Sequence, residues 1–130
     1  MGKDKFKLPK EWFNQANYDL QTAEAMFKTG RYIYTVFMCH LSIEKALKGL
    51  YAKNFQKSPP KTHDLNYLSK EINLMFSEEL KIFMDNLNDL SIPTRYPDEL
   101  DKLLTQYKKD RTEKVLNQTK VLLLWLKEKL

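Results

Sequence analysis

Apolar residues recur at helical spacing through almost the whole chain, and this pattern limits the possible folds more than any other feature. In successive segments they return every three or four positions, which is typical of amphipathic helices. No segment alternates apolar and polar residues between turn residues, as a half-buried strand would. Only three glycines and five prolines occur among the 130 residues, so few positions interrupt the helices. The sequence therefore predicts an all-α protein.

Glycine and proline mark the first breaks in the pattern. A first helix is expected over residues 10–27, with Gly30 just beyond its end as a stop signal. A second helix is expected over residues 32–55. The end of this helix runs into KNFQKSPPKT, residues 53–62, which we expect to form a loop because Pro59 and Pro60 interrupt helix and push the residues before them to extended conformations.

In the second half of the chain, polar residues that could cap helix N-termini mark where four further helices are expected to begin. A side-chain oxygen at such a position can accept hydrogen bonds from the free amides of a helix N-terminus. On this ground we expect a short helix from Thr62, a fourth helix from the cap Ser77 to a break at Pro93, a short helical segment from Asp98 through Leu104, and a last helix from Asp110 to near Lys129.

Short links between helices imply an antiparallel, up-down bundle of four or five helices. We expect the first, second, fourth and last helices to form its core, with the third as a short cross-piece. A chain of 130 residues is long enough to bury a core without disulfides or a metal, so residues 1–130 are expected to form a single domain. Residues 1–9 are expected to be a flexible N-terminal tail.

Composition and charge narrow the class of protein. Hydrophobic residues make up 42% and charged residues 30% of the chain, which argues against disorder. The net charge of +5 suits phosphate-bearing partners better than cationic ones. Residues 1–12 are charged without an apolar run, and the single Cys39 cannot form an internal disulfide. We therefore expect a cytoplasmic protein without a membrane segment.

The run VLLLWL, residues 121–126, is apolar around the whole circumference of its helix. It is too short to cross a bilayer. Such a helix is either central in its own bundle or shared between two partners. Both interpretations stay open, and the excess of apolar residues in a small bundle favours a homodimer.

Known catalytic and metal motifs are missing from the sequence. His40, His63 and Cys39 have none of the zinc spacings, and the pair His40–Glu44 has no matching partner on another helix. We expect His40 to bond to Glu44 or to a backbone carbonyl. No nucleophile elbow or glycine-rich phosphate loop occurs, so a nucleotide would have to be held by side chains. The sequence predicts no cofactor and no catalytic residue.

The stretch IPTRYPDEL, residues 92–100, places Arg95 and Tyr96 between two prolines. Arginine binds phosphates through two parallel hydrogen bonds, and a tyrosine before Pro97 is held extended. This pair could present a guanidinium and an aromatic face to a nucleotide. Alternatively, Arg95 pairs with Asp98 and pins a corner of the fold.

Four segments in this order resemble the HEPN (higher eukaryotes and prokaryotes nucleotide-binding) domain. They are WFNQANYDLQTAEAMFKTGRY at 12–32, GRYIYTVFMCHLSIEKALKGLY at 30–51, THDLNYL at 62–68 and TRYPDEL at 94–100. The resemblance covers residues 12–126. It implies a helical bundle that dimerises and binds nucleotides or RNA. Members often pair with a separate small nucleotidyltransferase, and some are the ribonuclease toxins of toxin–antitoxin pairs.

The resemblance also assigns site residues. The family's Glu-Lys pair and the lysine that follows fall on Glu44, Lys45 and Lys48. The histidine that opens the third helix is His63. The Arg-Tyr-Pro-Asp element comprises Arg95, Tyr96, Pro97 and Asp98. We expect the Arg95 guanidinium to point into a cleft that His63 or Lys48 also reaches.

One departure from the family pattern bears on catalysis. In ribonuclease members, four to six residues separate the arginine from a histidine that follows it. At the matching positions after Arg95, this chain has Leu100, Asp101 and Lys102. Neither aspartate nor lysine easily replaces histidine as an acid or base near neutral pH. We therefore expect a non-catalytic module that binds a nucleotide or a partner protein. A ribonuclease that combines Arg95 with His63 is the alternative, and an interaction subunit without a ligand is a third possibility.

Overall fold

The computed structural model describes residues 6–90 and 97–130, and this part of the chain forms helices without any strand. The all-α prediction is therefore confirmed for the described residues. Six helices occur there: α1 (Pro9–Lys28), α2 (Tyr32–Phe55), α3 (Leu65–Glu71), α4 (Glu78–Asn88), α5 (Pro97–Gln106) and α6 (Lys109–Lys127). Most of the expected N-terminal tail and the expected break at Pro93 lie outside the described residues.

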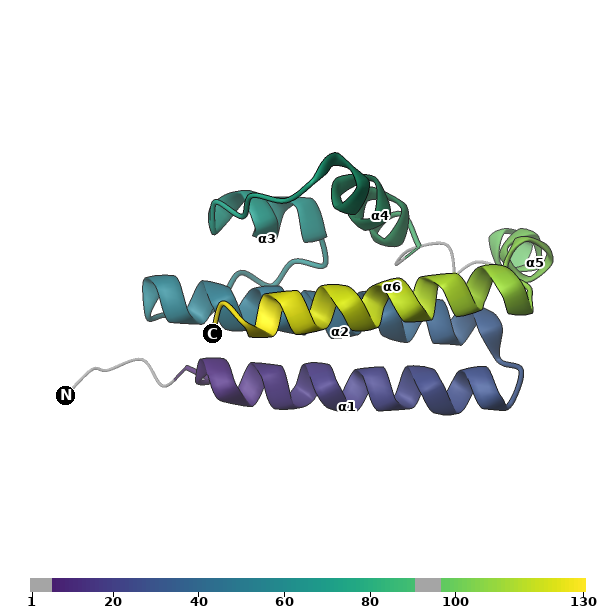
Figure 1. Ribbon diagram of the computed structural model, residues 1–130, viewed down its shortest axis with the longest axis horizontal. Coiled ribbons are helices and arrows are strands. Elements are labelled where there is room, and N and C mark those ends of the chain that lie inside the picture. The colour runs from purple at the N-terminus through teal and green to yellow at the C-terminus, as the bar shows by residue number, and fades with distance from the viewer. Residues whose placement is uncertain (1–5, 91–96) are drawn as a thin grey trace.

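Three long helices form the body of the bundle, and three shorter ones cover one side and one end of it (Figure 1). α1 and α2 are antiparallel neighbours, and α6 packs against both. α6 runs in the same direction as α2, because α3, α4 and α5 carry the chain back to the end of the bundle where α2 begins. α3 and α4 pack over α2, while α5 lies at the end near the turn between α1 and α2.

α4 differs from its expected role as a long bundle helix. It has 11 residues, and its foreshortened ribbon in Figure 1 shows that it lies at a steep angle to the three long helices. It still contributes to the core, because Phe83, Met84 and Leu87 are buried. The apolar spacing of this segment therefore predicted burial correctly, but it could not indicate the direction of the helix axis.

The helix boundaries agree with the sequence where the stop or cap signal is local. α2 occupies the predicted residues, and Gly30 ends the preceding turn with a φ of 77°, a left-handed conformation that suits glycine. Ser77 caps α4, since its hydroxyl accepts a hydrogen bond from the Leu80 amide at 3.2 Å. These interactions involve residues close in sequence, so the sequence shows both partners.

Three predicted helix starts are wrong. α3 begins at Leu65 with Asp64 as its cap, whereas Thr62 accepts a hydrogen bond from the Asp64 amide at 3.1 Å. α5 begins one residue before Asp98, since the fixed φ of proline suits the first position of a helix. α6 begins at Lys109 and ends at Lys127, so Asp110 lies in its first turn. Asp98 and Asp110 are therefore not caps. They lie in the first turns of α5 and α6, where a negative charge stabilises the positive end of the helix dipole.

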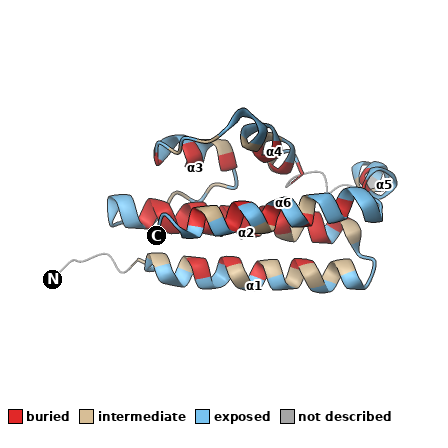
Figure 2. Ribbon diagram, viewed as in Figure 1, coloured by how far each residue is buried: buried red, intermediate tan, exposed pale blue. Residues whose placement is uncertain are grey.

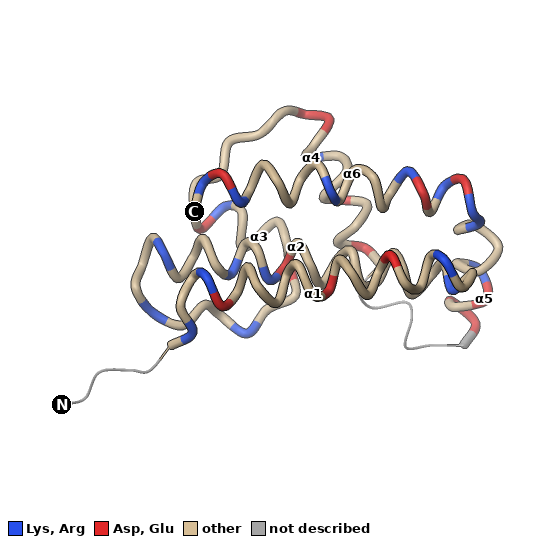
Figure 3. Tube along the Cα trace, turned by 60° about the horizontal axis from the view of Figure 1, so that its bottom comes forward, with Lys and Arg blue, Asp and Glu red and all other residues tan. Residues whose placement is uncertain are grey.

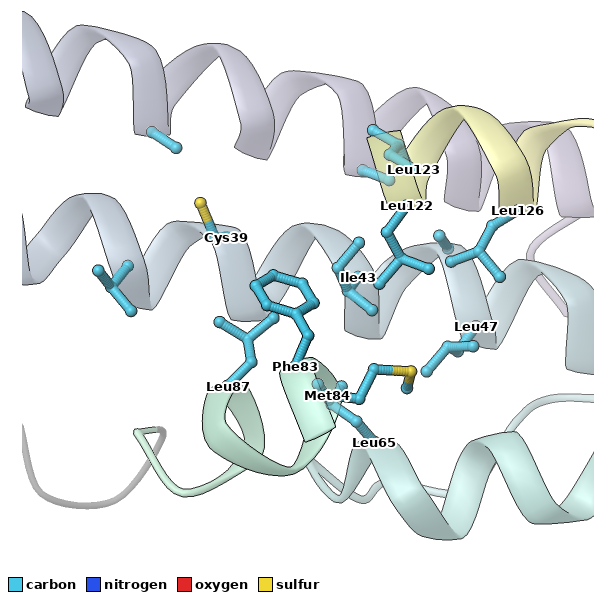
Figure 4. Close-up of a cluster of buried hydrophobic side chains, with 14 of the residues drawn as sticks. Cys39, Ile43, Leu47, Leu65, Phe83, Met84, Leu87, Leu122, Leu123 and Leu126 are labelled. Atoms are coloured by element: carbon cyan, nitrogen blue, oxygen red, sulfur yellow. The ribbon is translucent and has the colours of Figure 1, made fainter. Parts of the chain in front are cut away.

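The core surrounds α2, which is buried on almost every side (Figure 2). Figure 4 shows side chains of α2, α3, α4 and α6 meeting there, among them Cys39, Ile43 and Leu47. From the apolar run on α6, Leu122, Leu123 and Leu126 enter this core. Val121 and Leu124 stay 65% and 63% exposed, so one chain does not cover the whole circumference of this helix.

Within residues 6–90 and 97–130, no helix is both long enough and apolar enough to cross a membrane.

Candidate functional site

The centre of the candidate site is Glu44, a carboxylate in the middle of α2 whose side chain is only 3% exposed. A buried charge is costly unless it is paired and hydrogen-bonded. Lys48, one turn later on the same helix, places its Nζ 3.1 Å from Glu44 Oε2. Because both side chains are buried, this pair balances its own charge inside the fold.

The second oxygen of Glu44 binds a histidine that lies mostly in solvent. His63 Nδ1 donates a hydrogen bond to Glu44 Oε1 at 2.9 Å, although its side chain is 60% exposed. The carboxylate can only accept, so the Nδ1 position carries the proton. This hydrogen bond fixes the orientation of the ring and leaves Nε2 available to another molecule.

A second histidine, His40, holds the segment before α3 against α2. Its buried ring donates a hydrogen bond from Nε2 to the backbone carbonyl of His63 at 3.0 Å. This confirms the expected bond to a backbone carbonyl. Its Nδ1 lies 3.9 Å from Glu44 Oε1, too far for a hydrogen bond. Burial lowers the pKa of His40 below its ordinary value, because it outweighs the nearby Glu44 charge.

Asn88, at the end of α4, also binds the segment that carries His63. Its Oδ1 accepts a hydrogen bond from the Leu65 amide at 2.8 Å, and its Nδ2 donates one to Asp64 Oδ1 at 3.1 Å. The burial of His40 and these two bonds hold the backbone on both sides of His63. The exposed ring therefore stands on a segment fixed by α2 and α4.

Sequence reasoning missed two members of this arrangement. Trp12 on α1 lies beside the cluster, with the Lys48 ammonium 5.9 Å from its ring centroid. Asn88 lies 24 positions from Asp64 in the sequence. Trp12 opens the first of the four family-like segments, but the resemblance gave it no site role, and Asn88 lies in none of the four segments. A tryptophan near the start of an amphipathic helix is more often a core residue, so no sequence signal distinguishes Trp12.

The remaining predicted site residues do not join the cluster. Lys45 turns towards α1, where its Nζ lies 2.9 Å from Asp19 Oδ2. Asp98 is exposed on α5, at the end of the bundle near the α1–α2 turn (Figure 1). Arg95 and Tyr96 lie outside the described residues, and so does the predicted cleft that Arg95 would share with His63 or Lys48.

Lysine and arginine positions lie at both ends of the bundle (Figure 3). One group lies at the end where α1 begins and α2 and α6 end. Lys53, Lys127 and Lys129 belong to this end, as do Lys57 and Lys61 on the segment that leads to His63. Within the described ranges, no three His, Cys, Asp or Glu side chains gather as metal ligands would.

A family model described as the HEPN domain matches residues 9–130. The chain belongs to the HEPN domain family. Among solved structures, TT1696 from Thermus thermophilus is 25% identical with a TM-score of 0.80, and the match covers 94% of this chain and 98% of that one. The structure of ST0689, an archaeal HEPN homologue, is 24% identical with a TM-score of 0.73, covering 95% of this chain and 98% of that one. The comparison with curated proteins returns no match.

Family membership explains why motifs that are weak one by one identified the HEPN domain correctly. The Glu-Lys pair of α2 and the histidine before α3 lie 19 positions apart, yet Glu44 and His63 are bonded in the structure. In this HEPN chain, the motif residues that meet at Glu44 are a structural ion pair, Glu44–Lys48, and the exposed side chain of His63.

Proposed function

We propose that this HEPN protein is a non-catalytic module that binds a nucleotide, with His63 as one of the residues that contact the phosphate. The observation that supports this function is the exposed imidazole bonded to a buried carboxylate. A histidine with a purely structural role would gain from burying its ring. Here the ring stays in solvent while its orientation is fixed, so little freedom is lost when a ligand binds.

The charges around His63 favour an anionic ligand. Lys48 already balances Glu44, so a protonated His63 adds a positive charge at the surface. Lys57 and Lys61 on the same segment are exposed and add two more. A protonated ring can donate from Nε2 to a phosphate oxygen, and a neutral ring can accept there from a ribose hydroxyl. Arg95 and Tyr96 are the proposed partners from the IPTRYPDEL stretch.

Thermal unfolding with a panel of nucleotides tests this function. A ligand that binds only the folded state at about 100 times its Kd adds roughly 2.7 kcal/mol of stability. We expect His63→Gln to lose most of the nucleotide-induced rise in Tm. The control is Lys28→Gln, which removes an exposed cation from the last turn of α1, at the other end of the bundle, and should keep the rise. Equal stabilisation of parent and His63→Gln protein would refute the role of His63.

The same geometry favours one alternative, a metal-independent ribonuclease with an atypical site. A carboxylate that orients an imidazole is an arrangement used in general acid–base catalysis. Labelled single-stranded RNA incubated with the protein and a chelator tests this activity. Cleavage by the parent that disappears in His63→Gln would support the alternative. Intact RNA together with nucleotide-induced stabilisation would support the binding module.

We further propose that the module works as a homodimer and pairs with a separate small nucleotidyltransferase, as in a toxin–antitoxin pair. Family membership and the exposed apolar residues of α6 support this assembly. Co-expression with a nucleotidyltransferase encoded beside it, followed by size-exclusion chromatography, tests the pairing. Separate elution of the two proteins at micromolar concentration would argue against it.

A further inference from the structure

A cavity lies between α4 and α6 and shares no lining residue with the Glu44–His63 cluster. Its volume is about 200 Å³. Buried side chains of α4 and of the residues just beyond it form one apolar wall: Phe83, Leu87 and Leu90. Half-buried Val115 of α6 lies opposite. Asn86 and Gln118 also line the cavity, so the apolar wall and the polar side chains together suit a small ligand with an apolar body and a polar group.

Cations stand at the edge of this cavity. Arg111 and Lys114 line it from α6, and both are exposed. In the described part of the chain, neither forms an ion pair with an acidic side chain. The Arg111 guanidinium lies 4.3 Å from the ring centroid of Tyr107, which holds it over the cavity. Two cations are therefore available for an anionic group.

Tyr107 adds a polar group to the lining. Its side chain is buried between the end of α5 and the start of α6. Burial raises the pKa of the Tyr107 hydroxyl, while Arg111 acts in the opposite direction and Asp89 adds to the rise. The hydroxyl therefore stays protonated at neutral pH and can donate a hydrogen bond.

We propose that this cavity binds a compact aromatic acid, a single planar ring that carries one carboxylate or phosphate group. The ring would lie against Leu87, Leu90 and Val115, and the anion would face Arg111 and Lys114. None of the residues that line this cavity belongs to the Glu44–His63 cluster. The ligand is thus separate from the proposed nucleotide at His63.

Methyl-detected NMR with two probes, benzoate and phenyl phosphate, tests the proposal on the full chain. We expect saturable shifts centred on the methyl groups of Leu87, Leu90 and Val115. Neutral benzamide and inorganic phosphate should bind more weakly, because each lacks one half of the recognised chemistry. The probe with the lower Kd, benzoate or phenyl phosphate, shows which anionic group the cavity prefers. A lower Kd for either probe than for benzamide and inorganic phosphate supports the proposal.

Variants of the two cations separate this site from general surface binding. In Arg111→Gln/Lys114→Gln protein, the Kd for the tighter probe should rise about tenfold or more, because the double variant removes both cations that face the anion. The control Lys109→Gln removes a cation of α6 that does not line the cavity, and its Kd should match the parent's. Equal binding of benzamide and benzoate, an unchanged Kd in the double variant, or shifts scattered over other methyl groups would each overturn the proposal.

Discussion

The backbone of Gly49 on α2 lies directly against the ring of Phe13 on α1. A Cβ atom at Gly49 would stand 2.9 Å from Phe13 Cδ2 and Cε2, and 3.0 Å from Trp12 Cβ. Phe13 is buried, so its ring has little space to move. A glycine inside a helix costs about 1 kcal/mol relative to alanine, and here the close approach of two helices offsets that cost.

Gly49→Ala should therefore destabilise the protein, although alanine is the better helix former. Overpacking costs about 1–3 kcal/mol, so we expect a net loss of about 1 kcal/mol in the free energy of unfolding. Urea denaturation measures the change. The control is the same substitution in a Phe13→Leu background, where the smaller side chain should reduce the loss. A Gly49→Ala protein as stable as its parent would show that the two helices can separate without cost.

The stability of the protein should decrease on acidification because of His40. Its folded pKa lies below its ordinary value of 6.5, so in the window between the two the unfolded chain binds more protons than the folded one. The contribution of neutral His40 to the free energy of unfolding is therefore complete above this pH window, and it decreases as the pH falls through the window. His40→Gln keeps an N–H donor for the His63 carbonyl and should flatten the slope as the pH falls below 6.5. Parallel urea titrations measure both slopes, and equal slopes would assign the proton uptake to another group.

Cys39 should be chemically inert in the folded protein. Burial raises the pKa of its thiol to about 11, although Thr119 and Lys120 lower it slightly. A thiol-reactive dye should label it slowly in buffer and rapidly in urea. As a control, a cysteine at exposed position 29 in a Cys39→Ala background (Thr29→Cys) should react rapidly without denaturant. Rapid native labelling of Cys39 would mean that α6 separates readily from α2.

Much of the fold could be predicted because its signals are local. The apolar spacing, Gly30 and Ser77 define α1, α2 and the start of α4 from residues a few positions apart. The start of α3 was misplaced because Thr62 and Asp64 are both good capping residues. In the structure Asp64 accepts hydrogen bonds from the Asn66 and Tyr67 amides, and its further contact with Asn88 spans 24 positions, so the sequence does not show it.

The candidate site could be predicted only in part, for a different physical reason. The family motif indicated Glu44, Lys48 and His63, but not that two of them would neutralise each other in the interior. Whether a lysine side chain faces a ligand or a carboxylate inside the fold depends on how the helices pack around it. Lys45 and Lys48 are three positions apart, and they pair with Asp19 and Glu44 respectively.

A charge on the exposed face of α6 should dissociate the proposed dimer. Val121 and Leu124 are exposed, and Leu124 lines a cavity of about 320 Å³ between α1 and α6. We expect light scattering to show a dimer for the parent and a monomer for Leu124→Glu, with unchanged helical circular dichroism. Met75→Glu changes an apolar side chain that is 85% exposed elsewhere and should remain dimeric. A monomeric parent at micromolar concentration would contradict the homodimer.

Arg95→Ala should abolish nucleotide-induced thermal stabilisation while leaving the helical signal and the dimer intact. This prediction rests on the proposed function, in which the Arg95 guanidinium binds the phosphate through two parallel hydrogen bonds. Arg31→Ala removes an exposed arginine from the turn between α1 and α2 and provides the control. If the Arg95 variant keeps the nucleotide-induced rise in Tm, Arg95 does not hold the ligand.

Two adjacent residues at the end of α4 reach different parts of the protein. Leu87 lines the cavity between α4 and α6, and Asn88 holds the Leu65 amide and Asp64 beside His63. A ligand that shifts α4 at Leu87 therefore also acts on the segment that carries His63. If both proposed ligands bind, thermodynamic linkage makes the effect reciprocal. The factor by which an aromatic acid changes the affinity for a nucleotide must then equal the factor by which the nucleotide changes the affinity for the acid.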